Sequence, residues 1–189
     1  MTAKTKSYIL LHITVLLFGF TGVLGKLISL GSSDLVWYRM GLAVLALGVF
    51  LWLFPKPRLP KSSIKAMLAT GGVIALHWIL FFESIKQSSV SVALVGVTST
   101  TLFTALLAPL FTKQKMVGYE ILLGIMVLVG IGVIFQISTQ YHLGIILSVA
   151  AALLASVFTL INEQYIKKYA PSRVSFWEML GGWICISLY

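Results

Sequence analysis

Long apolar runs separated by short polar connectors make up almost the whole chain. Seven runs follow one another, at residues 8–30, 35–54, 67–85, 90–111, 121–137, 143–161 and 174–189. Most are close to the roughly 20 residues that a helix needs to cross the hydrocarbon core of a bilayer. None alternates apolar and polar residues with a period of two, which a membrane β-barrel requires. The pattern therefore predicts an all-α, polytopic helical membrane protein with about seven transmembrane helices.

The ends of the runs carry two further signals. Pro55, Pro57 and Pro60 fall in the connector 55–60 and exclude a helix there, because proline lacks a backbone N–H and clashes with the preceding turn. The last run has 16 residues and reaches the end of the sequence without a polar or basic stop. A native chain rarely ends inside a bilayer. We therefore expect the sequence to be a piece of a longer protein.

The composition agrees with a lipid-facing exterior. Hydrophobic residues make up 59% of the chain and charged residues 10%, whereas about a quarter of the residues of a soluble domain are charged. The single cysteine, Cys185, excludes a disulfide framework and a cysteine-rich metal site. Because it lies in an apolar run, we expect it to be a small core residue.

The positions of the basic residues give the orientation. The N-terminus and alternate connectors hold eleven lysines and arginines, and the connectors on the other side hold Lys86 alone. The eleven are Lys4, Lys6, Lys56, Arg58, Lys61, Lys65, Lys113, Lys115, Lys167, Lys168 and Arg173. By the positive-inside rule the N-terminus is cytoplasmic and the protein lies in the cell (inner) membrane. Because the net charge of +9 forms no continuous stripe, it does not indicate a nucleic acid partner.

A weak internal repeat is present. A shift of 140 residues lays the sixth run on the first and the seventh on the second. It pairs Phe158 with Phe18, Ser172 with Ser32, Trp177 with Trp37 and Gly181 with Gly41. With five helices between equivalent points, a second copy enters the membrane from the opposite side, as in many transporters. We therefore expect residues 1–139 to form a five-helix repeat and residues 140–189 to begin its inverted partner.

Four stretches, in this order and spacing, resemble the EamA-type members of the drug/metabolite transporter superfamily. They are residues 17–22, 38–43, 105–111 and 124–133, which hold a Phe-Gly pair, a Tyr-Arg pair, a helix-ending Pro109 and a Gly-rich helix. The family often carries Gly-Glu between its fourth and fifth helices, where this chain has Glu120 as the only acid nearby. The resemblance covers the whole chain. It implies ten helices around a central cavity and export of small metabolites, amino acids or drugs by alternating access.

His77 is the first candidate for a role in transport, because polar groups inside a membrane are costly and their positions are informative. Thr70, His77 and Ser84 are seven residues apart and share a helical face. A histidine here can bind substrate or take up a proton, or it can be neutral and bonded to a neighbouring helix. Trp78, beside it, is a candidate for the cavity wall.

Arg39 lies about one turn inside the second run. It can extend toward the interface, pair with an acid from another helix, or bind an anionic group of the substrate, for which its planar guanidinium is suited.

Hydroxyl groups concentrate in the fourth run. Thr98, Thr101 and three neighbours at helical spacing make a stripe of small and polar residues (Ala105, Ala108, Thr112). A similar face in the sixth run includes Ser148, Ser156 and Glu163. Such stripes can line a cavity or let helices approach closely. Asn162 and Glu163 stand at the cytoplasmic end of this run, and we expect both to be solvated helix-end residues.

Glu178 stands in the last run, about one turn from Arg173. It can pair with Lys167 or Lys168, or couple protons if it is buried. Motifs for a serine hydrolase, a zinc protease, a nucleotide-binding loop or a redox pair are absent from the sequence.

The leading hypothesis is thus a secondary transporter with no enzyme activity and no cofactor, whose partners are a small-molecule substrate and the bilayer. A homodimer and proton coupling are further hypotheses. The alternative is a non-transporting membrane scaffold or subunit, which predicts tightly packed hydroxyl stripes and no cavity among the runs 8–30, 67–85, 90–111 and 143–161.

Overall fold

The computed structural model describes residues 3–112, 115–137 and 139–188, and these form helices with no strand among them. The helices are α1 (Ala3–Leu27), α2 (Ser32–Leu53), α3 (Lys61–Gln87), α4 (Val90–Val97), α5 (Thr100–Phe111), α6 (Gly118–Ile137), the 3₁₀ turn η1 (Thr139–Tyr141), α7 (His142–Ile166) and α8 (Pro171–Ser187). Within the described residues six segments are long and apolar enough to cross a membrane: α1, α2, α3, α4 together with α5, α6 and α7. The predicted polytopic helical membrane protein is thereby confirmed.

The seventh predicted run also forms a helix, α8, which is shorter than the six segments that are long enough to cross a membrane. It has 17 residues, which is about 26 Å of helix at 1.5 Å per residue and less than the hydrocarbon thickness of about 30 Å. Pro171 starts it, at a position where the missing N–H would have no partner in the helix. By length and composition, then, six of the seven predicted runs reach the requirement for a membrane span.

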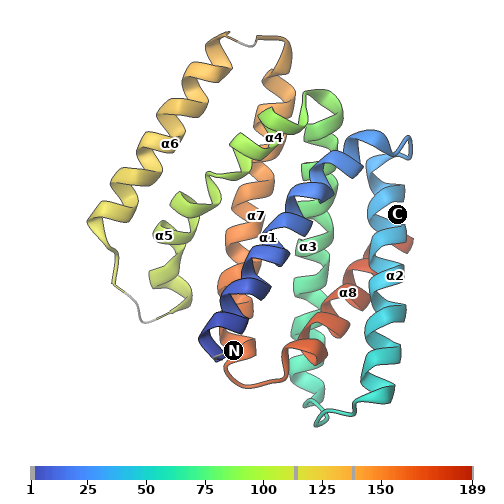
Figure 1. Cartoon of the computed structure of the whole chain (residues 1–189). Coiled ribbons are helices and arrows are strands. Elements are labelled where there is room, and N and C mark those ends of the chain that lie inside the picture. Colours follow the sequence, from blue (N-terminus) through green and yellow to red (C-terminus); the bar gives the residue numbers. More distant parts are fainter. Residues whose placement is uncertain (1–2, 113–114, 138, 189) are drawn as a thin grey trace.

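The connectors alternate between the two ends of the bundle (Figure 1). The N-terminal end of α1 and the connectors α2–α3, α5–α6 and α7–α8 all lie at the lower end in that view, and the described parts of these segments and of the helix ends beside them carry ten of the eleven basic residues. The connectors α1–α2, α3–α4 and α6–α7 lie at the opposite end. The charge asymmetry in the sequence therefore corresponds to one basic and one weakly charged end of the molecule.

The helix α3 lies at the centre of the packed core, against α7 and α8. At Gly71 a side chain would collide with the backbone of α8, since an added Cβ would lie 2.7 Å from the amide nitrogen of Gly182 and closer still to the carbonyl oxygen of Glu178. Small residues let membrane helices approach to backbone contact in this way. Buried residues of α2 and α3, including Met40, Ile74 and Phe82, belong to one hydrophobic cluster, and Met40 of this cluster lies beside Gly182.

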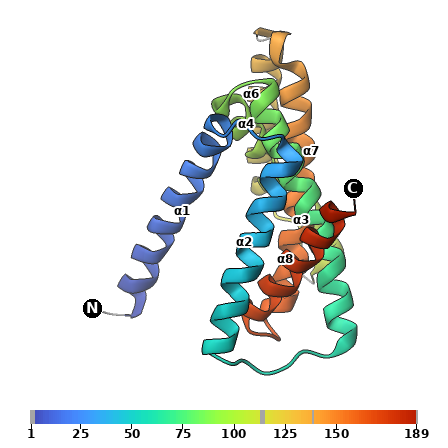
Figure 2. The same ribbon diagram turned by 90° about the vertical axis from the view of Figure 1, so that its right-hand side faces the viewer.

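By contrast, α1 stands apart. In Figure 2 it leans away from α2 and α3, and the gap widens toward the N-terminus. Only its C-terminal part touches the core: Gly22 faces Val90, and Gly25 faces Phe82. Most of its other side chains are exposed and apolar, which suits a surface in contact with lipid.

The prediction of one continuous helix over residues 90–111 is wrong at its middle. The helix ends at Val97 and resumes at Thr100. Four consecutive hydroxyls each donate a hydrogen bond to the carbonyl three residues earlier, at 2.5 Å (Thr98), 2.7 Å (Ser99), 2.7 Å (Thr100) and 3.0 Å (Thr101). Side chains that bond backward to carbonyls compete with the regular ladder of a helix, and this accounts for the interruption.

Two further expectations concern Cys185 and the connector between the fourth and fifth runs. Cys185 is exposed, so its interpretation as a core residue is wrong. Its position in an apolar run gave no information on which face of α8 packs inward. The connector in which the family's glutamate is absent includes Lys113 and Gln114, which lie outside the described residues.

Candidate functional site

A pocket of about 550 Å³ lies between α5, α6 and α7, and we call it the threonine pocket. Its lining residues are Thr100, Thr101, Thr104, Ala105 and Ala108 of α5, Glu120, Leu123 and Val127 of α6, and Leu160 and Glu163 of α7. This volume is in the range of about 300–1,000 Å³ that small-molecule sites occupy. The pocket begins where the fourth membrane segment is interrupted, because Thr100 and Thr101 are the first residues after the break.

Close contact between α5 and α6 beside the pocket determines how these helices lie. At Gly124 an added Cβ would lie 2.6 Å from Cβ of Leu102, so only glycine allows α6 to come this near to α5. Leu102 is buried in this contact, as is Ala105 in the pocket wall. Glycine and alanine thus bring the two helices together, while the threonines of α5 lie along the open space.

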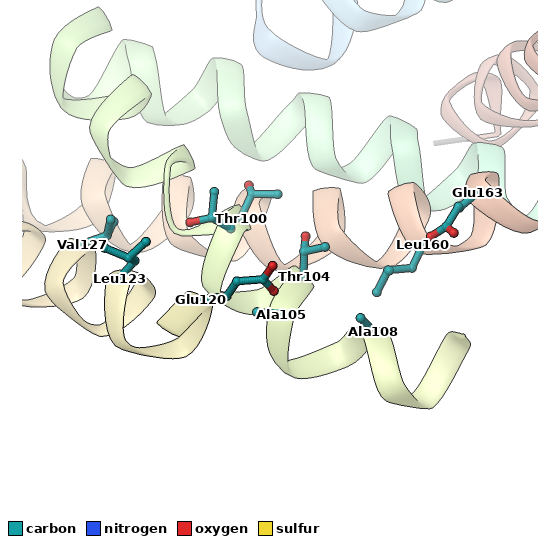
Figure 3. A pocket seen from close by; sticks show the side chains of 10 residues that line it. Thr100, Thr104, Ala105, Ala108, Glu120, Leu123, Val127, Leu160 and Glu163 are labelled. Carbon is teal, nitrogen blue, oxygen red and sulfur yellow. The ribbon is translucent and has the colours of Figure 1, made fainter. Parts of the chain in front are cut away.

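The polar groups of the threonine pocket are mainly hydrogen-bond acceptors. The hydroxyls of Thr100 and Thr101 already donate their hydrogens to backbone carbonyls, so their oxygens remain available to accept. The carboxylates of Glu120 and Glu163 accept as well. In Figure 3 Glu120 lies beside Thr104, and Glu163 lies at the other end of the pocket beside Leu160. Such a lining suits a ligand that presents N–H groups or a positive charge.

The apolar lining of the pocket is as important as its polar groups. Ala105, Ala108, Leu123, Val127 and Leu160 provide a surface that can bury the hydrocarbon part of a ligand. Among the described residues the one ion pair joins Glu163 to Lys167, whose Nζ atom is 2.6 Å from Oε1 of Glu163. Glu163 is therefore partly neutralised, and Glu120 is the pocket's carboxylate without such a partner in the described part of the chain.

Arg39 lies in a second pocket, of about 520 Å³, between α1, α2 and α3. Its guanidinium carbon is 4.0 Å from the centroid of the Trp78 ring and 5.7 Å from that of Phe82. The side chain therefore packs on aromatic rings of α3. The described residues include no acid that pairs with it. The rest of this pocket is largely apolar, with Leu24, Ile28 and other aliphatic side chains.

His77 joins two helices. Its Nδ1–H donates to the carbonyl oxygen of Ala151 on α7, at 2.7 Å. Its ring stacks on Phe81 with centroids 6.4 Å apart and meets Phe158 edge-on at 5.3 Å. Of the two interpretations left open by the sequence, a histidine bonded to a neighbouring helix is the one that this geometry matches.

The remaining predicted residues are dispersed. Thr70 and Ser156 are buried, and their hydroxyls donate to carbonyls of their own helices, at 3.0 Å (Ala66) and 2.7 Å (Leu153). Thr98 is exposed at the end of α4 and lines neither pocket. The structure thus brings Arg39 and Trp78 together and places Thr101 in the threonine pocket. It does not gather Arg39, His77 and Thr101 around one cavity.

Several residues of the threonine pocket were absent from the predicted set. Thr100 and Thr104 stand in the same hydroxyl-rich segment as Thr101, so this segment was the available signal. Glu120 could have been singled out because it is the only acid near the connector between the fourth and fifth runs. Glu163, expected as a solvated helix-end residue, stands in the last turn of α7, where its partly exposed side chain also lines the pocket. The same expectation is wrong for Asn162, whose Oδ1 atom is buried.

Comparison with known proteins gives the family. The model of the EamA-like transporter family matches residues 5–136, which is most of the chain. The chain belongs to the EamA-like transporter family. This EamA-like protein is therefore a multi-pass membrane protein of a family of transporters, and the resemblance seen in the sequence is confirmed.

Two relatives are similar to this EamA-like chain over most of its length. An uncharacterized transporter of Bacillus subtilis, YxxF, is 27% identical over 183 residues, which cover 92% of this chain and 58% of the relative. An uncharacterized transporter of Haemophilus influenzae is 25% identical over 163 residues, which cover 80% of this chain and 53% of the relative. The chain thus spans somewhat more than half the length of each. No solved structure matches it.

Proposed function

We propose that this chain forms part of a secondary transporter that exports a small amphipathic metabolite, amino acid or drug across the cell (inner) membrane by alternating access. The observation that carries the proposal is the threonine pocket, which opens at a break in a membrane-spanning helix. Transporters often bind substrate where a membrane helix is interrupted, because irregular backbone is tolerated there beside a cavity.

The lining of the pocket suggests the chemistry of the substrate. Hydroxyl and carboxylate oxygens at Thr101 and Glu120 would accept hydrogen bonds from an ammonium or amide group. Leu123 and Leu160 would cover an apolar part. In the second pocket Arg39 would take an anionic group, since guanidinium groups bind carboxylates through a planar pair of hydrogen bonds, and Tyr38 and Phe82 would contact an aromatic one.

The proposal includes an orientation and a repeat. The basic end of the bundle faces the cytoplasm, so the end of the threonine pocket that Glu163 lines lies on the cytoplasmic side. Residues 1–139 constitute one five-helix repeat and residues 140–189 the opening of an inverted second one. Alternating access would then arise from movement of one repeat against the other. Association with a second copy stays a prediction.

A non-transporting scaffold is the second candidate, and one observation favours it. Ser148 and Ser156 of α7 are fully buried, as tight packing of a hydroxyl stripe would require. The hydroxyls of α5 differ, since they border open space. Because the two stripes behave differently, packing alone does not account for the threonines of α5.

An efflux screen with a blocking variant tests the proposal. Cells that produce the intact protein would be loaded with a panel of labelled amino acids, amines and amphipathic drugs, and retention would be compared with cells lacking it. Thr104→Trp would fill the threonine pocket and abolish efflux of the exported compound. Thr14→Trp, at an exposed position of α1 outside both pockets, would preserve it. Full efflux by Thr104→Trp, or no effect of the protein on any compound, would count against this function.

A further inference from the structure

A buried carboxyl group lies on the far side of α7 from the threonine pocket. Glu178 of α8 is only 2% exposed. Its Oε2 atom accepts one hydrogen bond, from Nδ2 of Asn162 on α7, at 3.2 Å. The other oxygen, Oε1, is buried without a partner, and so is Oδ1 of Asn162. The expected pairing of Glu178 with Lys167 or Lys168 is wrong for Lys167, which pairs with Glu163.

The charged and titratable groups of the neighbouring helices are engaged elsewhere or lie at the surface. α8 packs against α2, α3 and α7. On α2, Arg39 stacks on Trp78 and Asp34 is exposed. On α3, Lys65 is exposed, and His77, Glu83 and Lys86 form hydrogen bonds, to Ala151, to Ser32 and Gln87, and to Leu30 respectively. On α7, His142 bonds to the carbonyl of Phe135. On α8 itself Nη2 of Arg173 donates to the carbonyl of Lys56, and its Nε atom is buried without a partner. In the described part of the chain, therefore, no cationic side chain is recorded in contact with Glu178.

This arrangement requires a positive ion from outside the described structure. A buried carboxylate is stable when a cation or several hydrogen bonds compensate its charge, and Glu178 has a single amide bond. Metal ions such as Ca²⁺ and Mg²⁺ take about six or more oxygen ligands, whereas only two buried oxygens lack partners here. A proton needs one oxygen.

Asn162 is suited to both protonation states of Glu178. Its Nδ2 donates to Oε2 of Glu178 in the structure, as it would to the ionised carboxylate. If its amide group turns over, Oδ1 faces the carboxyl instead and accepts a hydrogen bond from the protonated O–H. A lysine in its place could only donate. The same pair of residues can thus bind a proton and release it.

The position of Asn162 links this pair to the threonine pocket. Asn162 lies in the turn of α7 that also holds Leu160 and Glu163, which line the pocket. A change in its bond to Glu178 therefore acts on the helix that forms one wall of the pocket. We propose that Glu178 and Asn162 form the proton-binding site that couples export to the proton gradient. This inference rests on the function proposed above.

In each cycle one oxygen of Glu178 takes up a proton and later releases it, and no bond of the substrate changes. The test uses the intact protein in liposomes and the compound found by the efflux screen. Two quantities are measured: exchange of labelled for unlabelled compound without any gradient, and proton movement driven by the compound. Glu178→Gln keeps the shape of the side chain and removes the proton site. Glu83→Gln is the matched control, an acid on α3 outside both pockets.

We expect Glu178→Gln to lose compound-driven proton movement and to continue exchange, and Glu83→Gln to keep both. Wild-type proton movement in Glu178→Gln would overturn the inference, as would wild-type export that follows a sodium gradient and moves no protons. Absence of exchange in the wild type would instead contradict the proposed function.

A measurement on the wild type covers the case in which Glu178→Gln does not fold. Hydrophobic carbodiimides react with protonated carboxyl groups in membranes. We expect an adduct on Glu178 in peptide mass spectra that increases as pH falls, with parallel loss of proton movement. A Glu178 that stays unmodified while proton movement is lost would overturn the inference.

Discussion

The guanidinium group of Arg39 on α2 covers the indole ring of Trp78 on α3, with 4.0 Å between its Cζ atom and the ring centroid. A cation at membrane depth needs compensation, and an aromatic face supplies part of it without a second charge. Arg39 also lines the second pocket, so this contact holds its side chain in the wall of that pocket.

Loss of the Trp78 ring should destabilise the protein. We expect Trp78→Leu to lower the free energy of unfolding by about 1–3 kcal/mol through the lost cation–π contact and lost packing. Thermal unfolding in detergent measures it. Trp52→Leu is the control, because Trp52 is 79% exposed on the outside of α2. Equal melting temperatures for the two variants would contradict a structural contribution of the Arg39–Trp78 contact.

The contact of α3 with α8 should depend on Gly71. A methyl group there meets backbone atoms of Glu178 and Gly182, which cannot move independently of the helix. We expect Gly71→Ala to destabilise by about 1–3 kcal/mol or more, the usual cost of overpacking. Gly130→Ala, where an added Cβ meets nothing within 4 Å, should leave the melting temperature nearly unchanged. If Gly71→Ala were as stable as Gly130→Ala, the two helices would not pack at backbone distance.

The hydroxyl of Thr101 should affect substrate binding, and that of Thr14 on α1 should not. Thr101→Val keeps the shape of the side chain and removes one acceptor from the pocket. We therefore expect the KM for efflux to rise by about tenfold or less, which corresponds to one hydrogen bond. Thr14→Val is the control, because Thr14 is exposed and lines neither pocket. A larger change in KM for Thr14→Val than for Thr101→Val would place the substrate elsewhere.

His77 should act through its contact with α7. We expect His77→Ala to lower the melting temperature, because it removes the bond to Ala151 and the packing on Phe158. The variant that still folds should transport with the pH dependence of the wild type. A changed pH profile in His77→Ala, with that of Glu178→Gln unchanged, would assign proton uptake to His77 instead of Glu178.

Much of the fold was predictable because hydropathy determines which segments enter a membrane. The runs gave the helices, and the basic connectors gave the alternation that Figure 1 shows. The break at Thr98 and Ser99 was not predictable, because hydropathy is nearly the same on both sides of it. It depends on hydroxyls that bond back to their own chain.

The site was less predictable than the fold, since it depends on which faces pack together. Arg39 and Trp78 are far apart in the sequence, and nothing in either run indicates their contact. The same holds for Asn162 and Glu178, whose meeting requires α8 to lie against α7. The hydroxyl stripe made Thr101 a candidate for a cavity wall, and Thr101 lines the threonine pocket. The other walls of this pocket come from α6 and α7, which the stripe does not specify.

The orientation can be tested with single cysteines. Cys185 is the only cysteine, so Cys185→Ser gives a background free of thiols. We expect Lys86→Cys to react with a membrane-impermeant maleimide added to whole cells, and Lys56→Cys to react only after the membrane is opened. The opposite pattern would reverse the orientation and place the N-terminus outside.

The central claim is that the threonine pocket is an aqueous binding chamber and not a packed helix contact. Reaction of a water-soluble maleimide with Thr104→Cys, in the Cys185→Ser background of the intact protein, tests it most directly. Ser156→Cys is the control, because Ser156 is fully buried on α7. We expect Thr104→Cys to react readily, Ser156→Cys to stay unreactive, and the exported compound to protect Thr104→Cys. Equal resistance of both cysteines, or no protection by the compound, would contradict a transport site in this pocket.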